Sequence, residues 1–313
     1  METLIIYLTY IAYVFIVAVY TIKVVGWLRM PPHIRWDLYP VIHEKHYHYG
    51  GSYYEQQEWW TKPRPKNRWR SLLYSLKDNL YMGQYYKSKP LYWLFLLPWH
   101  LGFILIITFH ILCFFAATAM LGGLDIGAAS GQLAGVAFYY LLLVTGGIAF
   151  VTGTFGSIGM GIIRLADRSL RKYSMPMNFF NYLFFLVVYG SGLFAWLVLD
   201  PTLDEYRTYW LGLITLSPPV LHPMTLLHII LFDIFLIYLP FTRSTHYITR
   251  ILAYFFIRWD DEPNQRGSKM EGQINALLAQ KVSWEGPHIA TGKTWVEVAI
   301  EPGFPDAKKD HKG

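Results

Sequence analysis

Residues 91–118 read LYWLFLLPWHLGFILIITFHILCFFAAT, and this apolar stretch decides the fold. A helix of about 20 such residues is long enough to cross the hydrocarbon core of a membrane. The stretch carries His100 and His110, ten residues apart, and the region that begins with the apolar stretch 222–242 carries His228 and His246, eighteen residues apart. Because polar side chains are expensive inside a membrane unless a partner satisfies them, these four histidines indicate cofactor ligands.

The composition predicts an all-α membrane protein. Of the 313 residues, 54% are hydrophobic, and the mean hydropathy of +0.27 is too high for an ordinary soluble domain. We expect a bundle of five transmembrane helices. The first is a retained span, because it has Glu2 where a signal peptide has basic residues and shows no small-residue cleavage site. The expected spans are 3–26, 91–118, 133–161, 178–199 and 222–242.

Lysine and arginine predict the orientation. Eleven lie in 27–90, none lies between the second and third spans, four lie in 162–177, and Arg207 alone lies between the fourth and fifth spans. The positive-inside rule therefore places the N-terminus outside, and places 27–90, 162–177 and the tail after about residue 257 in the cytoplasm. The net charge of +6 follows from this topology and from anionic lipid, and gives no reason to expect nucleic acid. We expect a multi-pass protein of the cytoplasmic (inner) membrane.

The single cysteine limits the choice of cofactor. Cys113 lies inside a predicted span, so the chain forms no internal disulfide and holds no four-thiolate iron–sulfur cluster. The sequence has no Cys-x-x-Cys-His motif. A haem bound by the four histidines is therefore a non-covalent, b-type haem.

The direction of the spans predicts how the histidines pair. The second and fifth spans cross in opposite directions, so His100 pairs with His246 near the cytoplasm and His110 pairs with His228 nearer the outside. Each pair clamps one haem iron, and the two haems relay single electrons across the membrane. At 1.5 Å per residue the helices rise about 15 Å and about 27 Å between their histidines, so we expect irons about 20 Å apart.

This geometry contains a misfit. Eighteen residues of helix return to the same face, whereas ten residues end about 80° away from it. A kink at Pro98 and Gly102 offers one way to absorb the difference. The alternative is that the histidines are core residues satisfied by hydrogen bonds. Because there are four of them, two per helix and ordered to pair, this interpretation is the weaker one.

Four charged residues near the spans are further candidates. Arg164, Arg243 and Arg250 lie at the predicted cytoplasmic edge, where they serve either haem propionates or lipid head groups. Asp233 lies deep in a span, as a proton relay, as a partner of a buried polar group, or as a neutral carboxyl that faces the bundle.

Two segments extend beyond the four-helix core at 91–257. After the first helix, 1–26, the insert 27–90 is expected at the cytoplasmic membrane surface, and 258–313 forms a cytoplasmic tail. The glycine-rich third span allows close approach of a helix or of a flat macrocycle. These glycines are Gly146, Gly147, Gly153, Gly156, Gly159 and Gly161.

The insert predicts an amphipathic interfacial helix over 68–82, with a solvated loop as the alternative. It also holds His43, His46 and His48, which favour a surface or interface role over a metal site. The helix would present Trp69, Leu72, Leu73, Leu76 and Leu80 to lipid or to the bundle.

The tail predicts one helix, over 269–281, and has too little apolar surface to fold alone. It is either disordered or bound along a cytoplasmic partner, and we prefer the partner. The expected anchors are Trp284, Ile289, Trp295 and Val296.

These features resemble a known family, the gamma subunit of membrane-bound respiratory nitrate reductase, a five-span dihaem cytochrome b. The resemblance lies in the ten- and eighteen-residue intervals and in Phe241-Thr242-Arg243-Ser244-Thr245-His246, and it covers 91–257 and the first span. It implies that the outer haem adjoins a quinol site and that the inner haem passes electrons to a cytoplasmic iron–sulfur subunit.

The insert and the tail look like a particular branch of that family, found in transmembrane redox complexes of sulfate-reducing microbes. The carriers of this likeness are Pro31-Pro32-His33-Ile34-Arg35-Trp36, Trp59-Trp60-Thr61-Lys62-Pro63-Arg64 and Val282-Ser283-Trp284. The branch implies a heterodisulfide-reductase-like iron–sulfur subunit and a periplasmic multihaem cytochrome c as partners.

One departure concerns the quinone. The nitrate reductase branch has a lysine after the second span that is associated with the quinol site, whereas 119–132 has none. Polar contacts to menaquinone are then left to Asp125, Gln132, His222 and Thr225.

The leading hypothesis is a dihaem electron-transfer subunit of an oxidoreductase complex that does not itself catalyse the terminal reaction. A haem-free membrane anchor is the alternative. A transporter is third, because the sequence shows no inverted repeat and few intramembrane charges.

Overall fold

The computed structural model describes residues 2–29, 73, 76–77, 80–246, 248–249, 266–286 and 292–300. The chain divides into two compact units, one formed by 1–20 and 67–242 and the other by 21–66 and 243–313. The described residues form helices and no β-strand, and five of the helices are long and apolar enough to cross a membrane. The prediction of an all-α protein with five spans is confirmed.

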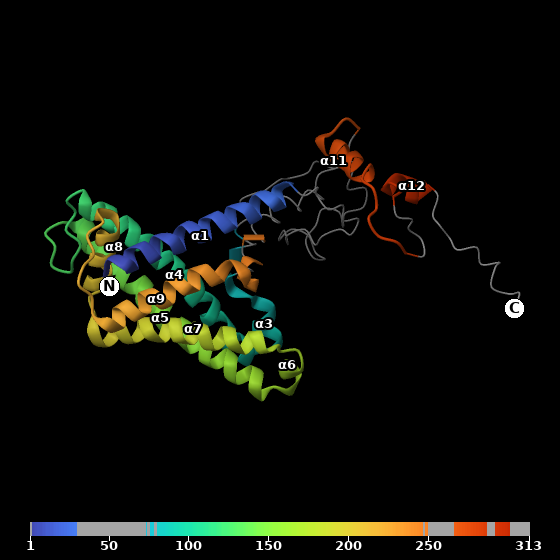
Figure 1. Ribbon diagram of the computed structural model, residues 1–313. Helices are drawn as coiled ribbons and strands as arrows, with labels where there is room; N and C mark the ends of the chain where they lie inside the picture. Colours follow the sequence, from blue (N-terminus) through green and yellow to red (C-terminus); the bar gives the residue numbers. More distant parts are fainter. Residues whose placement is uncertain are drawn as a thin grey trace, which may run out of the picture. The chain divides into compact units, whose positions relative to one another are not determined.

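Four of the long helices pack in sequence order, α4 on α5, α5 on α7 and α7 on α9 (Figure 1). A proline occupies the first turn of α4, α7 and α9, where its missing N–H has no helical acceptor to lose. The long helices are α1 (Glu2–Arg29), α4 (Pro90–Leu121), α5 (Leu133–Ala166), α7 (Pro176–Phe194), which continues as a π-helical turn (Ala195–Leu199), and α9 (Pro223–Tyr238).

Glycine brings α4 and α5 into backbone contact. A Cβ atom added to Gly102 would lie 2.5 Å from the Cα of Gly153, closer than real Cβ atoms approach other atoms. Small residues at a membrane helix crossing let the backbones approach and gain van der Waals contact. The glycines of the third span were expected to allow close approach of a helix or of a flat macrocycle. Gly153 approaches a helix, because it contacts Gly102 of α4.

A short helix that was not predicted from the sequence lies between the last two spans. This helix, α8 (Asp204–Thr215), packs against α4. It buries Tyr206, Tyr209, Trp210 and Leu213. Their spacing of three, four and seven residues is the apolar stripe of an amphipathic helix.

The last span is not one continuous α-helix from His228 to His246. The helix α9 ends at Tyr238, and 3-10 turns follow at Leu239–Phe241 and Arg243–Thr245. Pro240 has no N–H to donate, and its ring opposes the carbonyl four residues earlier, which ends an α-helix. The unbroken helix assumed for the expected rise of about 27 Å and for the shared face of the two histidines is therefore not present.

The described part of the tail contains one helix more than predicted. It contains α11 (Lys269–Leu278), close to the predicted helix over 269–281, and an additional helix, α12 (Trp295–Ile300). The segment between them is held by hydrogen bonds from Val282 N to Lys293 O, 2.8 Å, and from Gly292 N to Val282 O, 3.0 Å. Leu277, Val282 and Val298 are its buried apolar residues.

Of the insert, the structure describes only the end. The described leucines of the predicted interfacial helix are helical and exposed, as expected. They are Leu73, Leu76 and Leu80. Trp69, Leu72 and the cluster of His43, His46 and His48 lie outside the described residues.

Candidate functional site

His228 is held in one tautomer at the centre of the bundle. Its side chain is completely buried, and its Nδ1 lies 2.9 Å from the Oγ of Ser191 on α7. The hydroxyl of Ser191 donates its own hydrogen to the carbonyl of Val188, at 2.9 Å, so it accepts from His228. The proton of the imidazole is therefore on Nδ1, and Nε2 carries a lone pair.

The Nε2 of His228 is a buried nitrogen without a hydrogen-bond partner. Buried polar atoms are nearly always satisfied, so an exception asks for an explanation. A ligand histidine supplies one, since it typically donates one ring N–H to the protein and turns the other nitrogen to a metal.

His110 reaches the same part of the bundle from α4. Its side chain is 7% exposed, and its Nδ1 lies 2.7 Å from the carbonyl of Ile106. The ring of Phe232 stacks on the imidazole at 3.6 Å between centroids and 3° between planes, and lies 6.5 Å from the ring of His228. The stacked ring of Phe232 and the hydrogen bond to Ile106 together fix the orientation of the His110 ring.

His100 and His246 share this hydrogen-bond pattern. The Nδ1 of His100 lies 3.0 Å from the carbonyl of Leu96, and that of His246 lies 2.8 Å from the carbonyl of Arg243. A carbonyl only accepts, so in both imidazoles Nδ1 is the donor of this hydrogen bond. His100 belongs to the first unit and His246 to the second, so their pairing stays a prediction.

The histidines fit a b-type haem. Four histidines whose Nδ1 atoms each lie within hydrogen-bond distance of a protein oxygen have the donor chemistry that a bis-histidine haem would need. Around His228 the ring neighbours are aromatic, Phe150 at 5.5 Å and Tyr206 at 5.8 Å. In the part of the chain that the structure describes, no group of three or more His, Cys, Asp or Glu residues is placed to hold a metal ion.

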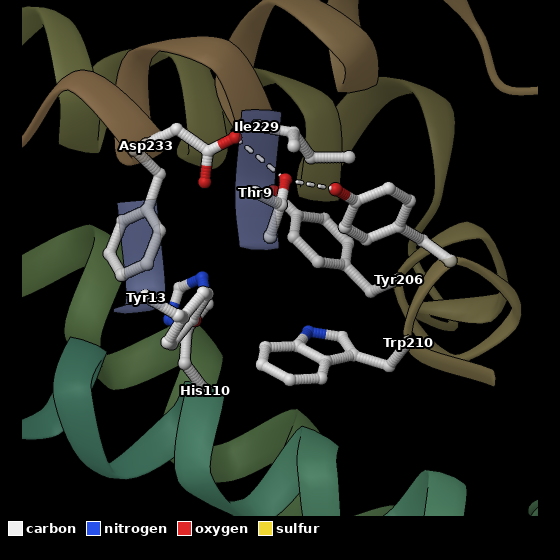
Figure 2. Close-up of a pocket in the computed structure, with 9 residues that line it drawn as sticks. Thr9, Tyr13, His110, Tyr206, Trp210, Ile229 and Asp233 are labelled. Atoms are coloured by element: carbon white, nitrogen blue, oxygen red, sulfur yellow. Dashed lines mark hydrogen bonds between the residues drawn. The ribbon is translucent and has the colours of Figure 1, made fainter. Parts of the chain in front are cut away.

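A pocket lined by aromatic, aliphatic and a few polar side chains includes His110 (Figure 2). In it the hydroxyl of Thr9 on α1 donates to Oδ2 of Asp233 at 2.7 Å and also contacts the hydroxyl of Tyr209 on α8. The sequence analysis named Asp233 but missed its partners. The pocket is lined by Thr9, Tyr13, His110, Tyr206, Tyr209, Trp210, Ile229, Phe232 and Asp233.

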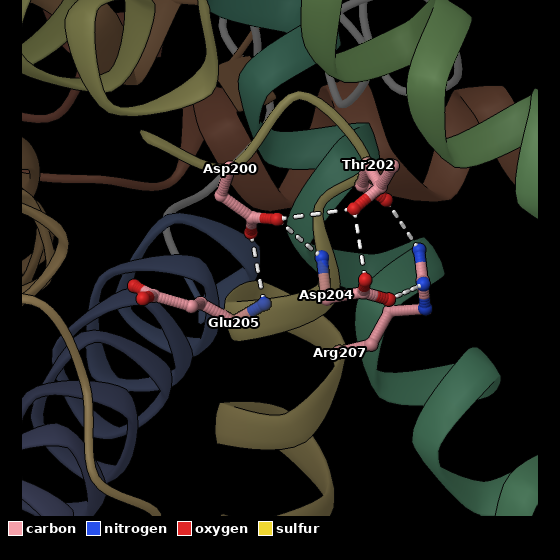
Figure 3. Close-up of polar contacts among 5 residues, drawn as sticks. All are labelled: Asp200, Thr202, Asp204, Glu205 and Arg207. Carbon is pink, nitrogen blue, oxygen red and sulfur yellow. Dashed lines mark hydrogen bonds and ion pairs between the residues drawn. The ribbon is translucent and has the colours of Figure 1, made fainter. Parts of the chain in front are cut away.

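The helix that carries Tyr209 is fixed at its start by Asp200 (Figure 3). The carboxylate of Asp200 accepts the backbone N–H of Asp204 at 2.7 Å and that of Glu205 at 2.8 Å, two groups that have no acceptor within the helix. Burial of the Asp200 carboxyl raises its pKa above the ordinary value, against the opposing effect of these hydrogen bonds.

Arg207, which the sequence analysis used only for topology, is buried on the same helix. It donates to the carbonyl of Thr202 at 2.6 Å and pairs with Asp204 (Figure 3). It also lies over the ring of Tyr139 at 5.2 Å. It therefore ties α8 to α5.

The arginines expected near haem propionates occupy different environments. Arg164 donates to the hydroxyl of Ser174 at 3.1 Å and to that of Tyr92 at 3.3 Å. Arg243 is exposed, and Arg250 lies outside the described residues. The prediction that they bind propionates is untested.

The polar candidates for a quinone are spread over several elements. The backbone N–H of Asp125 donates to the side chain of Gln132 at 2.9 Å, so these two residues are neighbours. The ring of His222 accepts the N–H of Met224 at the start of α9, at 3.2 Å, and the hydroxyl of Thr225 is buried without a partner. Asp125 and Gln132 are thus joined by a hydrogen bond, and His222 and Thr225 lie three residues apart at the start of α9.

Comparison with known proteins gives one match. The profile of a family described as nitrate reductase gamma subunit matches residues 68–260, more than half of the 313 residues. The matched segment includes all four histidines. No curated protein and no solved structure matches the chain.

Proposed function

The chain belongs to the nitrate reductase gamma subunit family, whose members are membrane haem b cytochromes in electron transfer, and from this premise we propose that it is a dihaem b-type cytochrome that relays electrons across the membrane. One haem is bound by His110 and His228, and the second by His100 and His246. The observation that carries the proposal is the buried Nε2 of His228, which has no partner while Nδ1 is held by Ser191.

A bound haem supplies reversible one-electron chemistry. The residues of the chain hold and shield it. Ser191 and the carbonyl of Ile106 fix the two imidazoles, and the aromatic rings of Phe150, Tyr206 and Phe232 exclude water around them. Ligand orientation, burial and hydrogen bonding are the means by which a protein sets a haem potential.

The relay connects two redox partners. On the outer side the donor or acceptor is the quinone pool, with menaquinone as the expected species, or a periplasmic cytochrome c. On the inner side it is a heterodisulfide-reductase-like iron–sulfur subunit. The charge alternation of the loops supports this orientation, and the exposed Trp284 and Trp295 of the tail support docking of a cytoplasmic partner. The chain acts as an electron-transfer subunit of an oxidoreductase complex of the inner membrane.

One observation favours the alternative of a haem-free anchor. Phe232 packs closely on His110, as an aromatic residue does on a structural histidine. The two functions differ in haem content, which can be measured directly.

The test is a pyridine haemochrome assay with redox difference spectra on the purified chain. Two b haems per chain are expected. His110→Ala and His228→Ala should each remove one spectral component, and His100→Ala and His246→Ala should remove the other. His288→Gln, a histidine outside the matched segment, is the control and should keep both haems.

Two results contradict the proposal in different ways. A chain that purifies with its partners but without haem is an anchor. Loss of the same component from the His100 and His110 variants shows that the pairing is wrong. Reduction of the haems by a menaquinol analogue in isolated membranes would identify the quinone as the outer partner.

A further inference from the structure

A chain of hydrogen bonds leads to the buried carboxyl of Asp233. The hydroxyl of Thr9 donates its single hydrogen to Oδ2 of Asp233 at 2.7 Å. Since that hydrogen is used, the contact of 2.5 Å between Thr9 and Tyr209 is donated by the tyrosine. The direction is therefore from the phenol of Tyr209 through Thr9 to the carboxyl (Figure 2).

The pocket around the carboxyl contains hydroxyl groups, but its nine lining residues include no cationic side chain. Asp233 is 1% exposed, and none of the nine residues that line its pocket is a lysine or an arginine. The titratable groups around it are Tyr13 from α1, His110 from α4, and Tyr206 and Tyr209 from α8. A buried carboxylate without a paired charge is costly, so its protonation depends on any charge that appears in this pocket.

The proposed electron-transfer site formed by His110 and His228, where the charge would change, is the one nearest to this pocket. His110 lines the same pocket, but its ring contacts are Phe232, Trp210, Phe109 and the carbonyl of Ile106, and its hydrogen bond is not to Asp233. The carboxyl thus lies next to the electron-transfer site without bonding to His110. An added electron there is felt through a medium of low dielectric constant.

We propose that Asp233 is the proton-loading group of the site formed by His110 and His228. When that site gains one electron from a quinol or a cytochrome c, Asp233 gains one proton. The hydrogen of Thr9 moves to the carboxylate, that of Tyr209 moves to Thr9, and a proton from the aqueous phase restores the phenol of Tyr209. One negative and one positive charge enter together, and both leave when the electron moves on. This inference rests on the proposed dihaem function.

The pocket is equipped for such a transfer. Besides the three bonded groups, the hydroxyls of Tyr13 and Tyr206 line it and have no hydrogen-bond partner among the described residues. Next to Thr9 in the sequence, Tyr10 is 38% exposed and donates to the carbonyl of Leu213 on α8.

The experiment is a spectroelectrochemical titration of the intact membrane complex between about pH 6 and pH 8. For one proton per electron, each tenfold change in proton concentration shifts the potential by up to about 59 mV. The component lost in the His110 variant should show such a slope in the unchanged protein, and Asp233→Asn should flatten it. The matched control Asp167→Asn, at the start of α6 (Arg168–Lys172) and away from this pocket, should keep the slope.

The outcomes separate this inference from the proposed function. A slope that persists in Asp233→Asn, with both haems present, overturns the inference alone, whereas absence of haem from the unchanged protein overturns the proposed function. If Asp233→Asn fails to assemble, infrared redox-difference spectra of the unchanged protein with isotope-labelled aspartate decide. A carboxylic acid band that appears on reduction supports proton uptake by an aspartate, and its absence contradicts the proposal.

Discussion

The Nδ1 of His228 lies 2.9 Å from the Oγ of Ser191, and this hydrogen bond joins α9 to α7 at the centre of the bundle. It orients the ring and, because Ser191 passes its own hydrogen to Val188, it also decides which nitrogen is left to bind a metal. Ser191 is thus a positioning residue for the proposed outer haem.

Substitution Ser191→Ala should weaken the haem bound by His228. Loss of an outer hydrogen bond to a metal ligand typically lowers metal affinity about 10- to 100-fold. The measurement is the haem retained per chain after prolonged dilution in detergent, together with the potential of the outer component. Ser191→Thr keeps a hydroxyl and is the control. Equal haem retention and equal potentials in both variants would show that the serine has no such role.

Substitution Gly102→Ala should destabilise the bundle. The new methyl would lie 2.5 Å from the backbone of Gly153, and overpacking of this kind costs about 1–3 kcal/mol. The midpoint of thermal unfolding in detergent should fall. Gly161→Ala is the matched control on α5, because nothing lies within 4 Å of its Cβ position, and it should unfold at an unchanged or higher temperature. An unchanged midpoint for Gly102→Ala would mean that the two helices are further apart.

Substitution Asp200→Ala should loosen α8. It removes the acceptor of two N–H groups in the first turn, and the loss of such a cap costs about 1 kcal/mol. The thermal midpoint should fall by a few degrees, and less for Asp200→Asn, which keeps one acceptor oxygen. A larger loss for the asparagine variant would contradict this account.

The stability that Asp200 contributes should also depend on pH. Burial raises the pKa of this carboxyl, so the folded state binds the proton more tightly than the unfolded state does. The contribution is then complete below the ordinary carboxyl pKa and declines as the pH rises through the raised value. The thermal midpoint of the unchanged protein should therefore exceed that of Asp200→Asn by the largest amount at acid pH. A difference that grows with pH would show that the carboxylate is the favoured form.

Substitution Trp295→Ala should reduce binding of the cytoplasmic partner. Trp295 and Trp284 are 38% and 51% exposed, their rings are 6.4 Å apart, and exposed tryptophans are frequent binding hot spots. Truncation of such a residue costs about 2 kcal/mol or more, which is a loss of affinity of roughly 30-fold. The measurement is the partner retained on washed membranes. Glu285→Ala, a polar exposed neighbour, should leave it unchanged. Equal retention in both variants would place docking elsewhere.

The long apolar runs allowed the five spans to be predicted, because length and hydropathy alone determine whether a helix can cross a bilayer. The predicted span 178–199 ends with the π-helical turn at Leu199, and the predicted start of the last span, residue 222, is the N-cap of α9. The tertiary detail of polar groups was harder to predict. Thr9, the partner of Asp233, lies 224 residues away in sequence, and Tyr209, which contacts Thr9, lies 200 residues from it, so no local pattern links them.

Two errors had visible signals. The stripe of Tyr206, Tyr209, Trp210 and Leu213 has helical spacing, but α8 is too short to be recognised as a membrane span. Pro240 predicts the end of α9 before His246, but the eighteen-residue interval was treated as unbroken helix. The hydrogen bond between Ser191 and His228 had no signal of this kind, since it depends on how α7 is rotated against α9.

The bonds of Thr9 to Tyr209 and Asp233 span 200 and 224 residues, so they constrain biogenesis as well as structure. The first helix leaves the ribosome long before either partner has been synthesised. During that interval the hydroxyl of Thr9 can return its hydrogen only to a nearby carbonyl of its own helix. The hydrogen bond of Thr9 to Asp233 therefore forms last, whereas the bonds of α1 to Tyr209 and Leu213 of α8 can form before the final span has been made.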